Sequence, residues 1–274
     1  MTAVGLIGLG EMGFAMGSRL IDQGHAVVGF DPDAARSAAA EAVGVRLCPS
    51  PAAVAADSDQ VVMCNVRTEA HLDSAWRGPD GARSAIKGRV LVIMSTFGPR
   101  AVELAAEEAA AAGGSVVDAP HTGSSPAARA GELIIWLAGN AHDIAAIRPV
   151  METLASATRV IGSRPGMAQA VKLINAMGLA INLSAVTEML AVADLHGVDG
   201  DLALEVIAGG SGSSWVTSAM PGVAGYLTVH HISNLLKDLR VAVEGVTQAG
   251  YPMPVTLASM NTIGLSWPRT TETS

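Results

Sequence analysis

The stretch AVGLIGLGEMGFAMGSRL, residues 3–20, decides the fold of this chain. A short apolar run leads into GLGEMG at residues 8–13, and a helical pattern of apolar residues follows at once. A GxGxxG motif between a strand and a helix is typical of a dinucleotide-binding unit. Gly8 permits the tight turn, Gly10 lets the backbone approach a pyrophosphate, and Gly13 lets the helix pack closely on the strand. Free N–H groups at the start of that helix favour phosphate binding.

An acidic residue follows the second predicted strand. Asp31 comes directly after the apolar run 26–30, where such a residue commonly binds the ribose hydroxyls of NAD and repels the 2′-phosphate of NADP. The neighbouring residues Pro32 and Asp33 add no positive charge, which favours NAD as the cofactor. Arg36 lies close enough to leave NADP possible. The alternative interpretation is that Asp31 only caps the next helix.

The first half of the chain alternates short apolar runs with helical stretches. The Val- and Ile-rich runs are typical of strands that are buried on both faces of a parallel sheet. This alternation predicts an α/β fold of Rossmann type, with a doubly wound and mostly parallel sheet. The runs that follow the first two predicted strands lie at residues 60–64, 90–94, 115–118, 133–138 and 158–161.

The pattern changes after Gly162. From Ala168 to His196 the sequence is apolar and periodic and contains no proline, and no convincing strand follows it. We predict a dinucleotide-binding domain over residues 1–163 and an all-helical substrate and dimerisation domain over residues 164–274, joined by a long helix. The apolar surface of that helix favours a homodimer or a higher homo-oligomer.

Charge and composition argue against several classes of protein. The 274 residues carry a formal net charge of −8, which disfavours binding to nucleic acid, and half of them are hydrophobic, unlike a disordered chain. The two cysteines, Cys48 and Cys64, form no CxxC pair, and the histidines show no HxxxH spacing, so we expect no metal site. No run of eighteen uninterrupted apolar residues occurs, so we expect no membrane span and a cytoplasmic location.

Five segments of the sequence carry a resemblance to one family. The opening GLGEMGFAM, the loop STFGP, the loop DAPHTGS, the segment GMAQAVKLIN and the late KDL occur in that order, at residues 8–16, 95–99, 118–124, 166–175 and 237–239. Together they resemble the β-hydroxyacid dehydrogenases, the 3-hydroxyisobutyrate dehydrogenase family. In that family the second segment is the ST-x-x-P loop near the nicotinamide, the third is the substrate loop DAPVSGG, and the fourth carries the catalytic lysine.

The resemblance implies the fold inferred above and an activity. The activity is reversible hydride transfer between a nicotinamide cofactor and a small 3-hydroxy acid or its aldehyde or keto counterpart, with Lys172 as general acid/base. A lysine can accept the hydroxyl proton if desolvation and the positive cofactor ring lower its pKa. A lysine that extends to water is the alternative. Asn175, about one helical turn further on, is expected to hold the substrate hydroxyl or to orient Lys172, with an asparagine that faces solvent or packs between helices as the alternative.

The remaining expected contacts follow from the same segments. Lys237 is expected to reach the cofactor, with a surface lysine as the alternative, and Trp215 is a candidate pocket wall, with a core tryptophan as the alternative. The expected cofactor contacts are Gly8, Leu9, Gly10, Glu11, Met12, Gly13, Asp31, Asn65, Val66, Ser95, Thr96 and Lys237. The expected substrate contacts are His121, Thr122, Gly123, Ser124 and Trp215.

The chain departs from the family pattern around the expected pocket. His121 replaces the usual valine, TGS at residues 122–124 replaces SGG, and Ala176 replaces the asparagine that the family typically carries four residues after the lysine. Together these changes predict an unusual substrate or weakened activity on ordinary ones. Two further interpretations stay open. One is an imine or keto reductase on the same scaffold, although imine reductases usually lack the lysine, and the other is a non-catalytic NAD-binding module.

Overall fold

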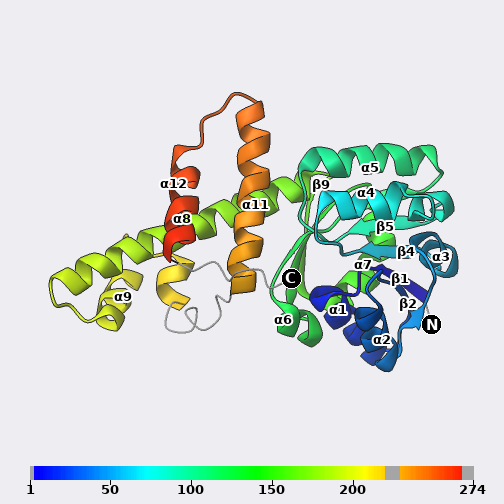
Figure 1. The fold of residues 1–274 in the computed structure, drawn as a ribbon, viewed down its shortest axis with the longest axis horizontal. Helices are drawn as coiled ribbons and strands as arrows, with labels where there is room; N and C mark the ends of the chain where they lie inside the picture. Colours follow the sequence, from blue (N-terminus) through cyan, green and yellow to red (C-terminus); the bar gives the residue numbers. More distant parts are fainter. Residues whose placement is uncertain (1–2, 220–228, 267–274) are drawn as a thin grey trace. The chain divides into compact units, whose positions relative to one another are not determined.

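The structure is a computed structural model that describes residues 3–219 and 229–266 (Figure 1). The chain divides into two compact units, Met1–Lys172 and Leu173–Ser274. The domain boundary between residues 163 and 164 stays a prediction.

A nine-stranded sheet forms the centre of the first unit. Its order is β3-β2-β1-β4-β5-β6-β8-β7, with β9 paired to β8. Among the described strands, the only antiparallel pairings are those of β8 with β6 and with β7, so the predicted mostly parallel sheet is confirmed. The strands β3 and β7 have two residues each, too short for an apolar run to reveal them. The strands are β1 (Ala3–Ile7), β2 (Ala26–Phe30), β3 (Arg46–Leu47), β4 (Val61–Cys64), β5 (Val90–Ile93), β6 (Ser115–Asp118), β7 (His121–Thr122), β8 (Leu133–Ala138) and β9 (Ala155–Gly162).

Helices cover both faces of this sheet (Figure 1). Successive strand residues point to opposite faces, so Leu6 packs in one buried cluster and Ile7 in the other. The first cluster includes residues of α1 (Glu11–Asp22), α2 (Ala34–Ala42), α6 (Ser125–Ala130) and α7 (Ala141–Leu154). The second includes residues of α3 (Pro51–Asp57), α4 (Glu69–Arg77), the 3₁₀ helix η1 (Ala82–Ala85) and α5 (Pro99–Ala111). The fold is therefore doubly wound, as predicted.

The described residues of the second unit form no strand. The long helix α8 (Met167–Leu195) begins in the first unit and continues through the second, which also contains α9 (Gly200–Ala208), α11 (Val229–Gln248) and α12 (Pro254–Ser266). Leu183, Leu204, Leu239 and Ile263 are among the residues of its buried core. By length and composition alone, α8 is long and apolar enough to cross a membrane. Core helices of soluble proteins meet the same two criteria.

Candidate active site

The glycine loop after β1 is closed by steric contacts that only glycine permits. Gly8 has φ +93°, and a Cβ there would lie 2.4 Å from the carbonyl oxygen of Asn65. A Cβ on Gly13 would lie 1.9 Å from the carbonyl oxygen of Gly8. The turn and the helix-strand approach that the motif predicts are therefore both present, and the loop is fixed against the end of β4.

Gly10, unlike Gly8 and Gly13, lies beside open space. A Cβ there would meet only Nη1 of Arg36, at 3.9 Å. Gly10 is also the N-cap of α1, and no side chain hydrogen-bonds to the first N–H groups of that helix. The loop thus leaves open space beside a helix N-terminus with free donors, which is the cradle that a dinucleotide pyrophosphate needs.

Asp31 organises this loop from the end of β2. Its Oδ2 accepts a hydrogen bond from Leu9 N at 2.8 Å, and its Oδ1 accepts one from Asp33 N at 2.9 Å. Arg36 Nη1 lies 4.0 Å from Oδ1. The Asp31 side chain is 5% exposed and the Arg36 side chain 58%, so the cation is the more accessible of the two charges at this end of the loop.

The loops after three parallel strands meet at the carboxyl edge of the sheet. Asn65 N donates to the carbonyl of Ile7 at 2.8 Å, which joins the loop after β4 to the end of β1. The hydroxyl of Ser95 donates to the carbonyl of Val66 at 2.6 Å, which joins the loop after β5 to the loop after β4. Thr96 follows directly in the sequence. In open parallel sheets, ligands bind along this edge.

A buried polar clamp attaches the start of α8 to the same edge. Oδ2 of Asp118 accepts hydrogen bonds from Gly166 N at 2.9 Å and from Gln169 N at 3.0 Å. The side-chain amide of Gln169 donates to Asp118 Oδ1 at 2.7 Å and to the carbonyl of Ser95 at 3.0 Å, and its oxygen accepts from Phe97 N at 2.9 Å. Both side chains are fully buried. Burial raises the pKa of Asp118 to about 6, while the hydrogen bonds from Gln169 lower it.

The clamp brings Lys172 and His121 into one region of the first unit. Lys172 lies three residues after Gln169 on α8, and His121 lies three residues after Asp118. Desolvation first, and then the charge of Lys172, lower the pKa of His121 to about 3, so its ring is neutral at physiological pH. The lysine predicted to be the general acid/base and a neutral hydrogen-bonding ring thus occur in one region beside the loop of Ser95.

The rest of the expected substrate loop borders His121. His121 and Thr122 form β7, which pairs antiparallel with Ile135 and Ile134 of β8. Gly123 has φ +119°, and a Cβ there would lie 2.7 Å from Cδ2 of Leu133. Ser124 is the N-cap of the short helix α6 and makes no side-chain cap hydrogen bond. Carboxylate binding by this loop stays a prediction.

The remaining expected residues belong to the second unit. Asn175 is exposed on α8, one turn after Lys172, whereas Ala176 is buried in the hydrophobic core of that unit. Trp215 is exposed within this unit, which disfavours the alternative that it is a core tryptophan. Lys237 Nζ lies 3.0 Å from Oδ1 of Asp238. Roles for Asn175, Trp215 and Lys237 in a ligand site stay predictions.

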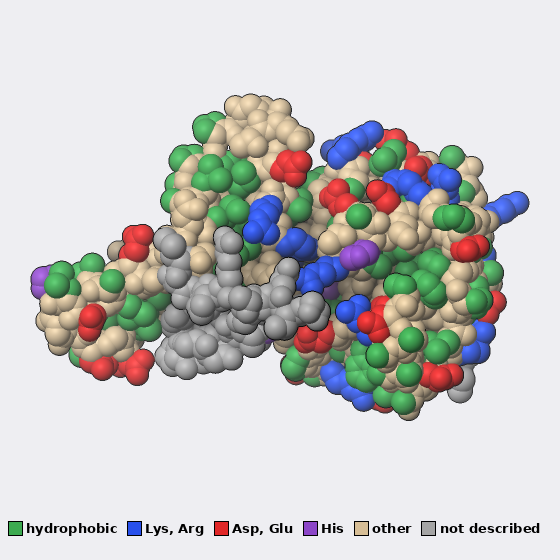
Figure 2. Space-filling model, in the orientation of Figure 1, with side chains coloured by type: hydrophobic (Ala, Val, Ile, Leu, Met, Phe, Trp, Pro, Cys, Tyr) green, Lys and Arg blue, Asp and Glu red, His purple; other side chains and the backbone are tan. Residues whose placement is uncertain are grey.

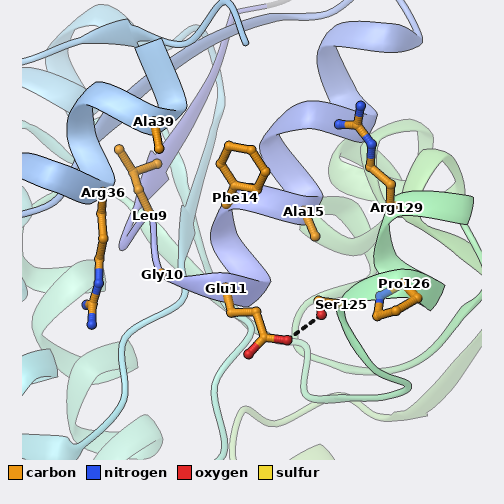
Figure 3. Close-up of a pocket in the computed structure, with 10 residues that line it drawn as sticks. All are labelled: Leu9, Gly10, Glu11, Phe14, Ala15, Arg36, Ala39, Ser125, Pro126 and Arg129. Carbon is orange, nitrogen blue, oxygen red and sulfur yellow. Dashed lines mark hydrogen bonds between the residues drawn. The ribbon is translucent and has the colours of Figure 1, made fainter. Parts of the chain in front are cut away.

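A pocket of about 560 Å³ lies beside the glycine loop, between α1, α2 and α6 (Figure 3). Arg36 and Arg129 lie on opposite sides of it, and the hydroxyl of Ser125 donates to Oε1 of Glu11 between them. This hydrogen bond fixes the carboxylate of Glu11 on the α6 side, away from Arg36. The pocket lining is Leu9, Gly10, Glu11, Phe14, Ala15, Arg36, Ala39, Ser125, Pro126 and Arg129.

The clamp and part of this pocket were not among the expected contacts. Gln169 lies in the segment GMAQAVKLIN, and a polar residue among apolar neighbours at a helix start is a signal for a buried hydrogen bond. Arg129 and Ser125 gave no signal, because only the packing of α6 on α1 brings them to the loop. No group of three or more His, Cys, Asp or Glu side chains that could hold a metal occurs in the described part of the chain.

Comparisons with known proteins agree with this architecture. Residues 3–162 match the family model described as the NAD binding domain of 6-phosphogluconate dehydrogenase. Residues 166–264 match the model described as NAD-binding of NADP-dependent 3-hydroxyisobutyrate dehydrogenase. The chain thus has the two parts of a dehydrogenase that uses a nicotinamide dinucleotide.

Individual relatives point the same way. The chain is 31% identical to 2-(hydroxymethyl)glutarate dehydrogenase of Eubacterium barkeri, over 92% of this chain and 85% of the relative. It is also 31% identical to 3-hydroxyisobutyrate dehydrogenase of Pseudomonas aeruginosa, over 92% and 89%. A solved structure of Mycobacterium tuberculosis 3-hydroxyisobutyrate dehydrogenase with L-serine has a TM-score of 0.88 and 26% identity, covering 97% of this chain and 94% of that chain. A Streptomyces aurantiacus imine reductase shares the fold, at 21% identity and a TM-score of 0.69. The chain therefore belongs to the β-hydroxyacid dehydrogenase family.

Proposed function

We propose that this chain catalyses reversible hydride transfer between a nicotinamide dinucleotide and a small 3-hydroxy acid, with Lys172 as the general acid/base. The observation that carries the proposal is the clamp of Asp118 and Gln169, which fixes the first turns of α8, and so Lys172, against the loop of Ser95. Family membership supports the reaction type, since the relatives named above are dehydrogenases.

The residues of the first unit fit the cofactor. The open side of Gly10 and the free N–H groups of α1 would hold the pyrophosphate, and the loop of Asn65, Val66, Ser95 and Thr96 would lie toward the nicotinamide. The bound nicotinamide ring supplies the hydride acceptor, or the donor in the reverse direction.

The protein supplies the proton transfer. In oxidation, Nζ of neutral Lys172 accepts the proton of the substrate hydroxyl as its carbon loses a hydride, and in reduction protonated Lys172 returns it. The neutral ring of His121 nearby adds no competing positive charge. Asn175, one turn later on α8, is proposed to hold the same hydroxyl.

Replacement of Lys172 tests this assignment. Lys172→Ala is expected to lower kcat by at least about a hundredfold, because positioned proton transfer contributes about 10²–10⁴-fold. Lys172→Arg is expected to lower kcat as well, because a guanidinium does not release its proton near neutral pH. Binding of NADH, followed by its fluorescence, is expected to stay unchanged in both variants. The exposed Lys87 provides the matched control, and Lys87→Ala is expected to retain full activity.

Activity assays on a set of carbonyl compounds separate the competing functions. Carbonyl compounds should be offered to the wild type with NADH, with and without an amine. Turnover that depends on the amine would favour an imine reductase, and NADH binding without turnover would favour a non-catalytic module. A Lys172→Ala variant that retains more than a tenth of the wild-type kcat, with chemistry rate-limiting, would exclude the proposed role of the lysine.

Cofactor preference, assembly and location are further parts of the proposal. Asp31 supports a preference for NAD, with NADP accepted through Arg36. Exposed apolar residues of α8, including Ile174, Val192 and Leu195, support a homodimer or a higher homo-oligomer. Acidic and basic side chains are interspersed over the visible face of the first unit (Figure 2), which supports a small-molecule substrate rather than nucleic acid. We propose a cytoplasmic location on the composition of the chain.

A further inference from the structure

The first turn of α1 carries an acidic residue where an anion is expected to bind. Glu11 is the first residue of that helix, directly after Gly10, and no side chain hydrogen-bonds to the first N–H groups. A helix N-terminus attracts any nearby anion, a carboxylate of the helix itself included. A carboxylate that turned toward these N–H groups would therefore compete with the pyrophosphate of the cofactor for the same positive end.

A hydrogen bond from α6 holds this carboxylate to one side. The hydroxyl of Ser125 donates to Oε1 of Glu11, and the carboxylate is directed toward α6 (Figure 3). Arg36 lies on the other side of Gly10, and its Nη1 would be 3.9 Å from a Cβ on Gly10. The open space beside Gly10 therefore has a carboxylate turned away on one side and an exposed cation on the other.

The helix that supplies the donor is itself held in place. Ser125 begins α6, and Ala128, about one turn further on, is fully buried in the cluster that also contains residues of α1. Nη2 of Arg129 lies 3.3 Å from Oδ2 of Asp22, the last residue of α1. Because packing and an ion pair hold α6 along α1, the hydroxyl of Ser125 is already positioned to bind the carboxylate of Glu11.

We propose that Ser125 is a positioning residue for the cofactor, whose hydroxyl keeps the carboxylate of Glu11 away from the pyrophosphate site at Gly10. Without that hydroxyl, the carboxylate turns toward the N–H groups of α1 or toward Arg36. In either place it repels the phosphates and narrows the open side of Gly10. This inference rests on the cofactor site of the proposed function, and it is independent of Lys172 and of the substrate.

Binding of NADH, followed by its fluorescence, tests the inference without turnover. Ser125→Ala is expected to raise the Kd for NADH by about three- to tenfold, the effect of one unit charge about 6 Å from another near a protein surface. Ser125→Thr keeps the hydroxyl and is expected to stay within about twofold of the wild type. The matched control is Ser84→Ala, which removes an exposed hydroxyl from η1 on the other face of the sheet and should leave the Kd unchanged.

Removal of the negative charge shows whether Ser125 acts through Glu11. Glu11→Gln keeps an oxygen that can accept from Ser125 but carries no charge, so its Kd for NADH should be no higher than that of the wild type. In the Glu11→Gln background, Ser125→Ala should change the Kd by less than about twofold. With Glu11 present, the rise in Kd caused by Ser125→Ala should shrink between about 50 mM and about 500 mM salt, because screening weakens the repulsion. A purely structural role of the hydroxyl would depend on neither the charge nor the salt.

The contrary results are distinct. A Kd for Ser125→Ala equal to that of the wild type, or one raised by the same factor in the Glu11→Gln background, would overturn the inference and leave the proposed function standing. A Ser125→Thr variant that binds NADH as weakly as Ser125→Ala would overturn it as well. A wild type that binds NADH but oxidises no hydroxy acid would contradict the proposed reaction alone, because the inference is measured by binding. A wild type that binds neither NADH nor NADPH would remove the proposed function and the inference together.

Discussion

The side-chain amide of Gln169 donates a hydrogen bond to Oδ1 of Asp118 at 2.7 Å, and both residues are fully buried. This contact connects the end of a central strand to the first turn of the long helix. Because Gln169 also bonds to Ser95 and Phe97, one side chain fixes both the loop after β5 and the helix that carries Lys172. A buried network in which every member is satisfied specifies one arrangement more strictly than apolar packing does.

Removal of the clamp is expected to be strongly destabilising. Gln169→Leu leaves Phe97 N, Ser95 O and one oxygen of Asp118 without this partner, at a combined cost of about 2–5 kcal/mol in the free energy of unfolding. The matched control is Gln248→Leu, since Gln248 is exposed and makes one long hydrogen bond to Glu244. That control should change stability by less than about 0.5 kcal/mol. Urea unfolding followed by circular dichroism measures both, and equal effects would show that the clamp contributes nothing specific.

Two glycines of the same loop are expected to respond differently to alanine. Gly10→Ala meets only Arg36 Nη1 at 3.9 Å, so the fold should keep its stability while the Kd for NADH rises by at least about tenfold. Gly13→Ala places its Cβ against the carbonyl of Gly8, so both stability and NADH binding should fall. Thermal unfolding and fluorescence titration give the two readouts. A Gly10→Ala variant that binds NADH as tightly as the wild type would place the pyrophosphate elsewhere.

The cofactor preference depends on the balance of Asp31 and Arg36. The wild type is expected to have a higher kcat/KM with NADH than with NADPH, because the carboxylate of Asp31 repels a 2′-phosphate. Arg36→Ala should lower kcat/KM for NADPH more than for NADH, since Arg36 is the exposed cation at this end of the loop. A wild type that prefers NADPH would contradict the assignment of Asp31.

Acid pH is expected to destabilise the chain through His121. Its pKa is about 3 in the folded chain and near 6.5 in an unfolded one, so between these values only the unfolded chain binds the proton. The free energy of unfolding therefore rises with pH in that window, and the contribution of His121 is lost as the pH falls from 6.5 toward 3. The loss is at most about 1.4 kcal/mol per pH unit.

His121→Asn separates this effect from that of the carboxylates. Because Asn does not titrate, the variant should lose less stability than the wild type between about pH 7.5 and about pH 5. Identical slopes for the two proteins would mean that His121 is as accessible to protons in the folded chain as in the unfolded one.

Self-association is expected to depend on the exposed apolar side of α8. Light scattering at micromolar concentration should give a dimer or a larger assembly. Val192→Glu together with Leu195→Glu should lower that mass, because both side chains are more than half exposed in the isolated chain. The control Leu104→Glu changes an exposed leucine of α5 and should leave the mass unchanged. A monomeric wild type would contradict the predicted oligomer.

Local chemistry in the sequence determined the nucleotide-binding half of this protein. The positive φ of Gly8 and the approach of Gly13 to the carbonyl of Gly8 involve only nearby backbone, and buried parallel strands require runs of Val and Ile. Both signals can therefore be read along the chain. The antiparallel pairing of β8 and the two-residue strand β7 gave no such signal, because the pairing of such short strands is decided by the sheet around them.

Only the tertiary structure decided which polar groups are left without partners. The sequence showed a histidine in place of valine and a glutamine near a lysine. It did not show that the side chain of Gln169 bonds both the loop of Ser95 and Phe97 and the end of β6, whereas Nδ1 of His121 finds no partner among the described residues. Hydrogen-bond satisfaction depends on groups that are 48 to 74 residues apart in the chain and meet only on folding. For that reason the family could be inferred from residues in order, whereas the partners of Gln169 and the surroundings of His121 are decided only when distant segments pack together.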